Sequence, residues 1–145
     1  MTFIRIKIFL VFICIAHFAG AQNSGRINWT FDGNYYTMVK EGNIIRVDPN
    51  TEEETIIIKK SQLTDPDSKN VLSPQSYEFN NNYTRVLIFT NTKKVWRYNT
   101  RGDYWLYDIF ANKLIKLGKG LASQSLMFAK FSPDGKRIAY VSEHN

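Results

Sequence analysis

Val95-Trp-Arg-Tyr-Asn-Thr-Arg-Gly-Asp-Tyr-Trp-Leu-Tyr-Asp108 is the densest aromatic stretch of the chain after its first 21 residues. A single arginine, Arg97, stands between Trp96 and Tyr98, and a run typical of a strand covers residues 103–108. Aromatic residues are enriched in strands because they pack well on a pleated surface. We therefore expect an extension over the first part of this stretch and a strand over the second.

Short strand-like runs separated by turn signals continue on both sides of this stretch. Asp32-Gly33-Asn34 and Asp48-Pro49-Asn50 are strong turn signals, because glycine tolerates positive φ and aspartate and asparagine bond their own backbone. The runs form two sets of four antiparallel strands, or meanders, and the start of a third. The expected strands are residues 27–31, 35–39, 43–47 and 54–59, then 76–79, 85–90, 103–108 and 113–117, and finally 126–131 and 137–141.

Two connections separate the meanders. Residues 61–74 are polar and contain little that could be buried. Gly118-Lys119-Gly120 is interpreted as a linker, since a lone G-x-G is weak evidence for a nucleotide-binding loop.

The meanders repeat along the chain. Trp29-Thr-Phe-Asp-Gly33, Phe79-Asn-Asn-Asn-Tyr83 and Phe131-Ser-Pro-Asp-Gly135 occupy equivalent places between first and second strands, 50 and 52 residues apart. Such a period with four strands per repeat is typical of β-propellers, whose blades stack because none buries both faces alone. We predict an all-β partial β-propeller of about two and a half four-stranded antiparallel blades, with the aromatic residue before each turn packed between blades. Because a closed propeller needs roughly 4 to 8 blades, residues 22–145 alone are expected to be unstable or to aggregate.

The first 21 residues have the pattern of a secretory signal peptide. Arg5 and Lys7 precede an uncharged apolar run over residues 8–15, and Ala19-Gly20-Ala21 is a small-x-small cleavage site. We expect cleavage after Ala21, which would leave residues 22–145 as a secreted or periplasmic domain. An uncleaved N-terminal anchor is the alternative, although the apolar run is shorter than the roughly 20 residues of a membrane span.

Few residues of the sequence could carry out chemistry. Cleavage would remove Cys14, the only cysteine, and would leave His144 as the only histidine. The chain also lacks a G-x-S-x-G elbow and a phosphate-binding Walker loop. We therefore expect no disulfide, no metal, no cofactor and no catalytic triad within these residues.

The charge of the chain is not concentrated. There are 19 Lys and Arg against 13 Asp and Glu, a formal net charge of +6 that falls to +4 without the two basic residues of the signal peptide. Lys59-Lys60, Lys93-Lys94 and Lys136-Arg137 are the only adjacent basic pairs. Because a nucleic-acid surface needs basic side chains gathered on one face, no nucleic-acid partner is expected.

Together these patterns resemble the propeller of the dipeptidyl peptidase IV family, in the prolyl oligopeptidase clan. In that family a Trp/Tyr-Arg pair is followed by an aromatic strand ending in Tyr-Asp, as in Val95–Asp108. Trp29–Gly33 and Phe131-Ser-Pro-Asp-Gly-Lys-Arg-Ile-Ala-Tyr-Val141 fall where the family has its blade-opening signatures. The resemblance covers nearly all of residues 22–145, and the order and spacing of the three motifs are more specific than the last motif alone.

The resemblance implies the N-terminal propeller part of a secreted or periplasmic serine peptidase that releases X-Pro or X-Ala dipeptides from free N-termini. It implies that the propeller gates substrate access and that Arg97 hydrogen-bonds a carbonyl of the bound peptide, a role that suits an always-charged guanidinium. The implied partners are the peptide substrate and the α/β-hydrolase domain of the full-length protein, and a homodimer of that protein is allowed. The family's paired glutamates and its catalytic serine, aspartate and histidine are expected beyond Asn145, so the chain as given is not expected to catalyse the reaction.

Glu52-Glu53-Glu54 lies in a hairpin of the first meander and is interpreted as a solvated turn.

Other interpretations remain open. On local features alone, Arg97 would stack on Trp96 or Tyr98 as a cation–π pair. The chain could also belong to a non-enzymatic exported propeller that serves as a binding scaffold, such as the periplasmic Tol-associated propeller, or be a gene remnant. A Glu-Glu pair and a G-W-S-x-G elbow after Asn145 would indicate the peptidase, whereas further blades alone would indicate the scaffold.

Three short motifs are weaker signals. Arg101-Gly102-Asp103 is an integrin-type tripeptide, but Gly-Asp is expected to turn the chain into the next strand. Asn28-Trp29-Thr30 and Asn82-Tyr83-Thr84 fit the N-glycosylation sequon, which matters only in a eukaryotic secretory pathway.

Overall fold

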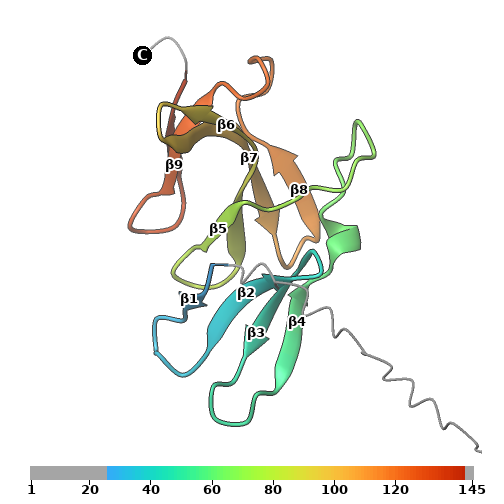
Figure 1. Ribbon diagram of the computed structural model, residues 1–145, viewed down its shortest axis with the longest axis vertical. Helices are drawn as coiled ribbons and strands as arrows, with labels where there is room; N and C mark the ends of the chain where they lie inside the picture. The colour runs from blue at the N-terminus through green and yellow to red at the C-terminus, as the bar shows by residue number, and fades with distance from the viewer. Residues whose placement is uncertain (1–25, 143–145) are drawn as a thin grey trace, which may run out of the picture.

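The computed structural model describes residues 26–142 as short antiparallel strands joined by turns, with one short 3-10 helix (Figure 1). The predicted signal peptide, residues 1–21, and His144 lie outside the described residues. Within residues 26–142, no helix is long and apolar enough to cross a membrane.

The strands form two sheets. The first has the order β1-β2-β3-β4, and the second has the order β10-β9-β7-β6-β5, with β8 paired to β7. The elements are β1 (Asn28–Trp29), β2 (Tyr36–Lys40), β3 (Asn43–Val47), β4 (Glu54–Ile58), η1 (Lys60–Gln62), β5 (Ser76–Phe79), β6 (Arg85–Val95), β7 (Tyr98–Asp108), β8 (Lys113–Lys116), β9 (Leu126–Phe131) and β10 (Ile138–Val141). The predicted all-β class is confirmed: β1–β4 form blade one, β5–β8 form blade two, and β9–β10 are the first two strands of blade three.

The tight turns follow from their residues. Glu41 and Gly42 join β2 to β3 with φ angles of 54° and 85°, the positive pair that a type I′ hairpin turn requires. The positive φ of Gly42, rather than a lack of space, favours glycine here, since the nearest atoms belong to the exposed and flexible side chain of Lys60. In the next hairpin, the Asn50 amide donates to Oδ1 of Asp48 at 2.8 Å, as turn-forming aspartates do.

The first turns of consecutive blades contact one another. The Phe31 amide of blade one donates to the Tyr83 hydroxyl of blade two at 2.7 Å, and the two rings meet edge to face at 6.0 Å. The Asn81 side chain of blade two donates to the Pro133 carbonyl of blade three at 2.8 Å. The three repeated motifs are therefore equivalent in space, as their spacing in the sequence predicts.

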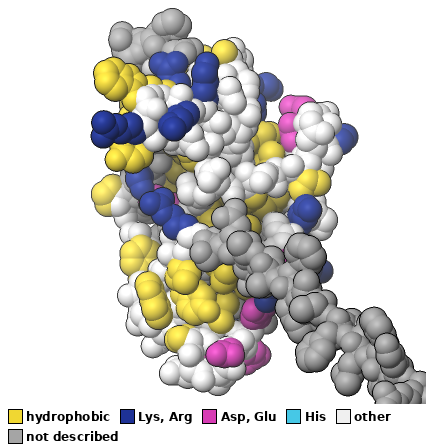
Figure 2. Space-filling model, viewed as in Figure 1, with side chains coloured by type: hydrophobic (Ala, Val, Ile, Leu, Met, Phe, Trp, Pro, Cys, Tyr) yellow, Lys and Arg dark blue, Asp and Glu magenta, His cyan; other side chains and the backbone are white. Residues whose placement is uncertain are grey.

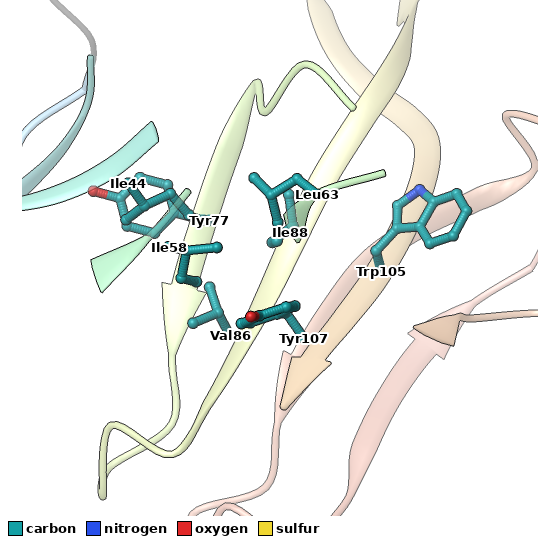
Figure 3. Close-up of a cluster of buried hydrophobic side chains, with 8 residues drawn as sticks. All are labelled: Ile44, Ile58, Leu63, Tyr77, Val86, Ile88, Trp105 and Tyr107. Carbon is teal, nitrogen blue, oxygen red and sulfur yellow. The ribbon is translucent and has the colours of Figure 1, made fainter. Parts of the chain in front are cut away.

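Two hydrophobic clusters lie on opposite faces of blade two. The larger joins Ile44 and Ile58 of blade one, and Leu63 after it, to Tyr77, Val86, Ile88, Trp105 and Tyr107 of blade two (Figure 3). The second joins Leu87, Phe89 and Tyr104 of blade two to Leu126 and Ala129 of β9. Successive residues of β6 alternate between the two clusters because side chains alternate across a strand. Blade two is thus buried on both faces, which explains its continuous apolar run.

Two predictions about packing need correction. Leu63 is 0% exposed and belongs to the larger cluster. The connection over residues 61–74, predicted to contain little that could be buried, therefore contributes a side chain to the core. Phe79 and Phe131 pack against the clusters as predicted, but the equivalent Trp29 is 62% exposed.

Candidate functional site

β6 and β7 are each 11 residues long and continue past the part that belongs to blade two. Inside the blade they pair as far as Thr90 and Asp103. Beyond this pair they run on as a hairpin that closes at the pair Val95 and Tyr98. We call residues 91–102 the arm.

The arm corrects the prediction for this stretch of sequence. The expected extension is a pair of strands, and Gly102-Asp103 lies inside β7 rather than at a turn. The polar run Asn91-Thr-Lys-Lys94 ends the hydrophobic alternation, but backbone pairing continues because it does not depend on apolar side chains. Asp103 is only 7% exposed, so the Arg-Gly-Asp tripeptide is not displayed as an integrin-type loop.

Two bulges bend the arm. Between Thr90 and Lys93, β6 has one residue more than the facing part of β7, and between Lys93 and Lys94 the extra residue is on β7. Asn91, in the first bulge, has a φ of 46°, a left-handed conformation that asparagine tolerates better than most residues. A bulge bends its strand and increases the local twist. Figure 1 shows β6 and β7 curving toward β9 at this end.

Gly102 faces the first bulge at a point where no side chain fits. An added Cβ would overlap Cε2 of Phe89 and lie 2.7 Å from the Thr90 carbonyl oxygen. This close approach, rather than an unusual φ, is the reason for glycine here.

At the base of the arm, β7 gains a further neighbour. Arg101 and Gly102 pair antiparallel with Met127 and Leu126 of β9. The arm is therefore joined to blade three as well as to blade two.

Arg97 lies at the tip of the arm, in the two-residue turn between β6 and β7. Its side chain is exposed, and within residues 26–142 it makes no hydrogen bond, ion pair or cation–π contact. Trp96 and Tyr98 are 94% and 73% exposed, so the stacking of Arg97 on either ring is not seen. Trp96 has a φ of 59°, which bulky residues rarely adopt and which is often found at functional sites.

Asp103 anchors a polar network at the base of the arm. Its Oδ2 accepts hydrogen bonds from Nδ2 of Asn91 at 2.8 Å and from Oγ of Ser123 at 3.1 Å. Its Oδ1 accepts from the Gln124 amide at 3.0 Å, and Nζ of Lys116 lies 3.5 Å from Oδ2. Burial by itself would raise the pKa of Asp103, but these hydrogen bonds and the lysine charge outweigh it and hold the pKa below its usual value.

A hollow of about 340 Å³ opens beside the base of the arm. The rings of Phe89 and Tyr104, stacked with centroids 4.5 Å apart, form part of its wall. Lys130 of β9 and Glu78 of β5 also line it and form an ion pair across it. The hollow therefore combines aromatic walls with charged groups next to the arm.

The face that carries the arm is basic and apolar. Figure 2 shows Lys and Arg side chains over the upper part of the molecule, where Figure 1 places β6, β7 and β9, mixed with hydrophobic side chains. Lys93, Lys94 and Arg97 contribute exposed positive charge on the arm itself. Of these three cations, Arg97 is the one in the turn at the tip of the arm.

The remaining predicted residues lie away from the arm. Glu54 pairs with Lys40 at 2.7 Å across the hairpins of blade one, and Glu52 and Glu53 are exposed beside it, as expected for a solvated turn. Asn82 is exposed in the turn before β6, whereas Asn28 is half-buried in β1. Within residues 26–142 there is no group of three or more His, Cys, Asp or Glu side chains that could hold a metal ion.

The Asp103 network is the part of this site that sequence reasoning missed. The only signal was the Arg-Gly-Asp tripeptide, which draws attention to Asp103 for a different reason. Ser123 and Gln124 follow it by about 20 residues, and nothing in their spacing links them to it.

Comparisons with known proteins find similarity to dipeptidyl peptidases. Residues 80–145 match the family described as "Dipeptidyl peptidase IV (DPP IV) N-terminal region". The chain is 29% identical over 119 residues to "Probable dipeptidyl peptidase 4" of Aspergillus fumigatus, an alignment that covers 82% of this chain and 14% of the relative. It is 24% identical over 100 residues to "Probable dipeptidyl-aminopeptidase B" of Ajellomyces dermatitidis, covering 69% of this chain and 11% of the relative.

The fold has a counterpart among solved structures. The crystal structure of Porphyromonas gingivalis dipeptidyl peptidase 4 superposes with a TM-score of 0.69 at 24% sequence identity, over 82% of this chain and 16% of that one. This likeness shows the fold, a segment of a β-propeller. The chain thus spans between 11% and 16% of the length of these three proteins.

Proposed function

We propose that the chain is a member of the dipeptidyl peptidase IV family and forms the N-terminal propeller part of an exported serine-type dipeptidyl peptidase. In this proposal the propeller gates access of the substrate, and Arg97 holds one carbonyl of the bound peptide. The substrates are peptides with a free N-terminus and proline or alanine in second place. The α/β-hydrolase domain of the full-length protein supplies the nucleophile and its base.

The observation that carries the proposal is the state of Arg97. It is exposed at the end of an arm that leaves blade two, and it has no partner within residues 26–142. A guanidinium keeps its charge at any physiological pH and presents five donors in a rigid plane. A side chain of this kind, held on a bent arm and without a partner among the described residues, is suited to an acceptor from a bound ligand.

The neighbours of Arg97 support the same role. Trp96 and Tyr98 flank it with two exposed rings that a bound peptide could cover. When water is excluded, a hydrogen bond from a charged donor to a carbonyl becomes stronger, because the local dielectric constant falls. The aromatic rings would thus increase the affinity that Arg97 provides.

Replacing Arg97 in the full-length protein tests the proposal. Arg97→Ala should lower kcat/KM toward an X-Pro p-nitroanilide by roughly 10- to 150-fold, which corresponds to the loss of about 1.5–3 kcal/mol for a charge-assisted hydrogen bond. Arg97→Lys should recover part of this loss, since it keeps the charge but not the planar fork of donors. An unchanged kcat/KM in Arg97→Ala would refute the role given to Arg97.

Lys94→Ala is the matched control, because Lys94 is an exposed cation on the same arm. It should leave kcat/KM nearly unchanged, which separates a specific contact from a general effect of positive charge. If the full-length wild-type protein releases no dipeptide from any such substrate, the binding-scaffold interpretation replaces the peptidase.

The exported location is a proposal that rests on the N-terminal sequence. Mass spectrometry of the protein from its own cells should find a mature N-terminus at Gln22. Recovery of peptides that contain Arg5 or Lys7 from the mature protein would contradict cleavage after Ala21.

A further inference from the structure

Asp103 is a buried carboxylate that the proposed function leaves without a role. We infer that it is a positioning residue: by fixing the base of the arm to the loop between β8 and β9, it holds Arg97 in a defined place on the propeller. The inference rests on the proposed role of Arg97 and adds the side chain that places it. The Asp103 carboxylate itself touches no substrate in this account.

Within residues 26–142, the four groups that contact the carboxylate are donors. Asn91 offers an amide N–H, Ser123 a hydroxyl, Gln124 a backbone N–H and Lys116 an ammonium group. An ionised aspartate is an acceptor only, so it satisfies all of them at once. An asparagine in its place would offer one acceptor oxygen and would turn an amide N–H toward another donor. The network therefore requires the charged form of this residue.

The network holds both strands of the arm at the same level. Asn91 belongs to β6 and Asp103 to β7, and both bond to the same short loop, since Nε2 of Gln124 also donates to Oδ1 of Asn91 at 3.0 Å. This level coincides with the first bulge, where the ladder between β6 and β7 is interrupted. An interrupted ladder is where a hairpin bends most easily. Side-chain bonds at this point replace the missing backbone bonds.

Because the arm is long, a small rotation at its base displaces its tip by several ångströms. Arg97 lies in the turn six residues before Asp103, a separation of about 20 Å in an extended chain. A rotation of roughly 10° at the base would move the tip by about 3 Å over this distance. Hydrogen bonds tolerate changes of only a few tenths of an ångström before they weaken. A loosened base would therefore misplace Arg97 even though its own surroundings are unaltered.

Asp103→Asn in the full-length protein tests the inference with two measurements. Hydrogen exchange followed by mass spectrometry should show faster exchange in peptides covering residues 91–102, with the blade-two part of β6 little changed. The value of kcat/KM should fall, by no more than it falls in Arg97→Ala. Unchanged exchange in the arm would overturn the inference.

Asp108→Asn is the matched control on the same strand. Asp108 also accepts hydrogen bonds, from the Ala111 amide at 2.9 Å and from Nε of Arg85 at 3.3 Å, but it lies at the far end of β7 from the arm. Its replacement should lower the melting temperature without changing exchange in the arm or KM. If Asp108→Asn changed arm exchange and KM as Asp103→Asn does, both variants would act through general stability and the inference would be wrong.

A double-mutant cycle shows whether Asp103 acts through Arg97. In the Arg97→Ala background, Asp103→Asn should cause no further loss of kcat/KM, so the coupling should exceed about twofold, the lower bound for residues that share a network. An equal loss in both backgrounds would refute the inference. If Arg97→Ala alone had no effect, the proposed function would fail, while the exchange measurement would still decide whether Asp103 fixes the arm.

Ser123→Ala provides a milder variant in case Asp103→Asn fails to fold. It removes one donor at the edge of the network and leaves the carboxylate in place. It should change arm exchange and kcat/KM in the same direction as Asp103→Asn and by less. No change in either measurement would count against the network as the anchor of the arm.

Discussion

The two ends of the arm carry charged side chains in opposite states. Arg97 is exposed at the tip without a partner in the described part of the chain, whereas Asp103 is buried at the base among four donors. A buried charge is tolerated only where such partners compensate its lost hydration. Asp103 therefore contributes to structure, and Arg97 is available for binding.

The pH dependence of stability should reveal the charge of Asp103. Because its folded-state pKa lies below the unfolded value of about 3.9, its contribution is fully present above that value and is lost as the pH falls through the folded pKa. The melting temperatures of wild type and Asp103→Asn should differ at pH 7 and converge below about pH 4. A difference that stays constant down to pH 3 would show that the charge of Asp103 is not what stabilises the fold.

Gly102, the one glycine of the arm, should be costly to replace. Gly102→Ala should lower the melting temperature of the propeller, because its Cβ would meet the Phe89 ring and the Thr90 carbonyl, an overpacking that costs about 1–3 kcal/mol. Differential scanning calorimetry beside Lys94→Ala, an exposed site on the same arm, measures the effect. Equal melting temperatures for the two variants would mean that β6 and β7 accommodate the added methyl group without loss of stability.

At the scale of elements, the connection after blade one is part of the core. Leu63 is fully buried beside η1, and the side chain of Gln62 donates to the Tyr107 hydroxyl of blade two at 2.8 Å. Leu63→Ala should therefore destabilise the propeller by about 2–5 kcal/mol, the range for removing a buried leucine. Leu121→Ala, at a 48% exposed site, should change stability by no more than about 0.5 kcal/mol. Similar losses measured by chemical denaturation for both variants would contradict this placement of Leu63.

The sequence predicts the strands of the blades but not the hairpin of the arm or the Asp103 network. β3, β5 and β9 have the predicted bounds, because turn residues on each side mark their ends. The arm was not predicted as a hairpin, since the polar residues 91–94 interrupt the pattern on which strand prediction depends. The Asp103 network could not be predicted, because it joins residues that only the folded path of β7 and the loop before β9 brings together. The binding role of Arg97 stays a prediction that rests mainly on the family resemblance.

At the scale of the whole molecule, large apolar side chains remain exposed on the described part of the chain. Phe31, Phe128 and Trp29 are 74%, 61% and 62% exposed, and among the described strands β10 pairs with β9 alone. Open sheet edges and apolar faces of this kind promote association. Residues 22–145 produced alone should therefore aggregate or melt without cooperativity. A sharp thermal transition from a monomer, shown by calorimetry and light scattering, would contradict this expectation.

The central claim is that Arg97 of this propeller hydrogen-bonds a carbonyl of the bound peptide. The most direct test measures the Kd of an X-Pro dipeptide ligand, and of its alkene isostere that lacks the internal carbonyl, for full-length wild type and Arg97→Ala. We predict that loss of the carbonyl weakens binding to wild type by about tenfold or more and leaves binding to Arg97→Ala nearly unaffected. An equal loss for both proteins would show that another group binds the carbonyl and would contradict the account.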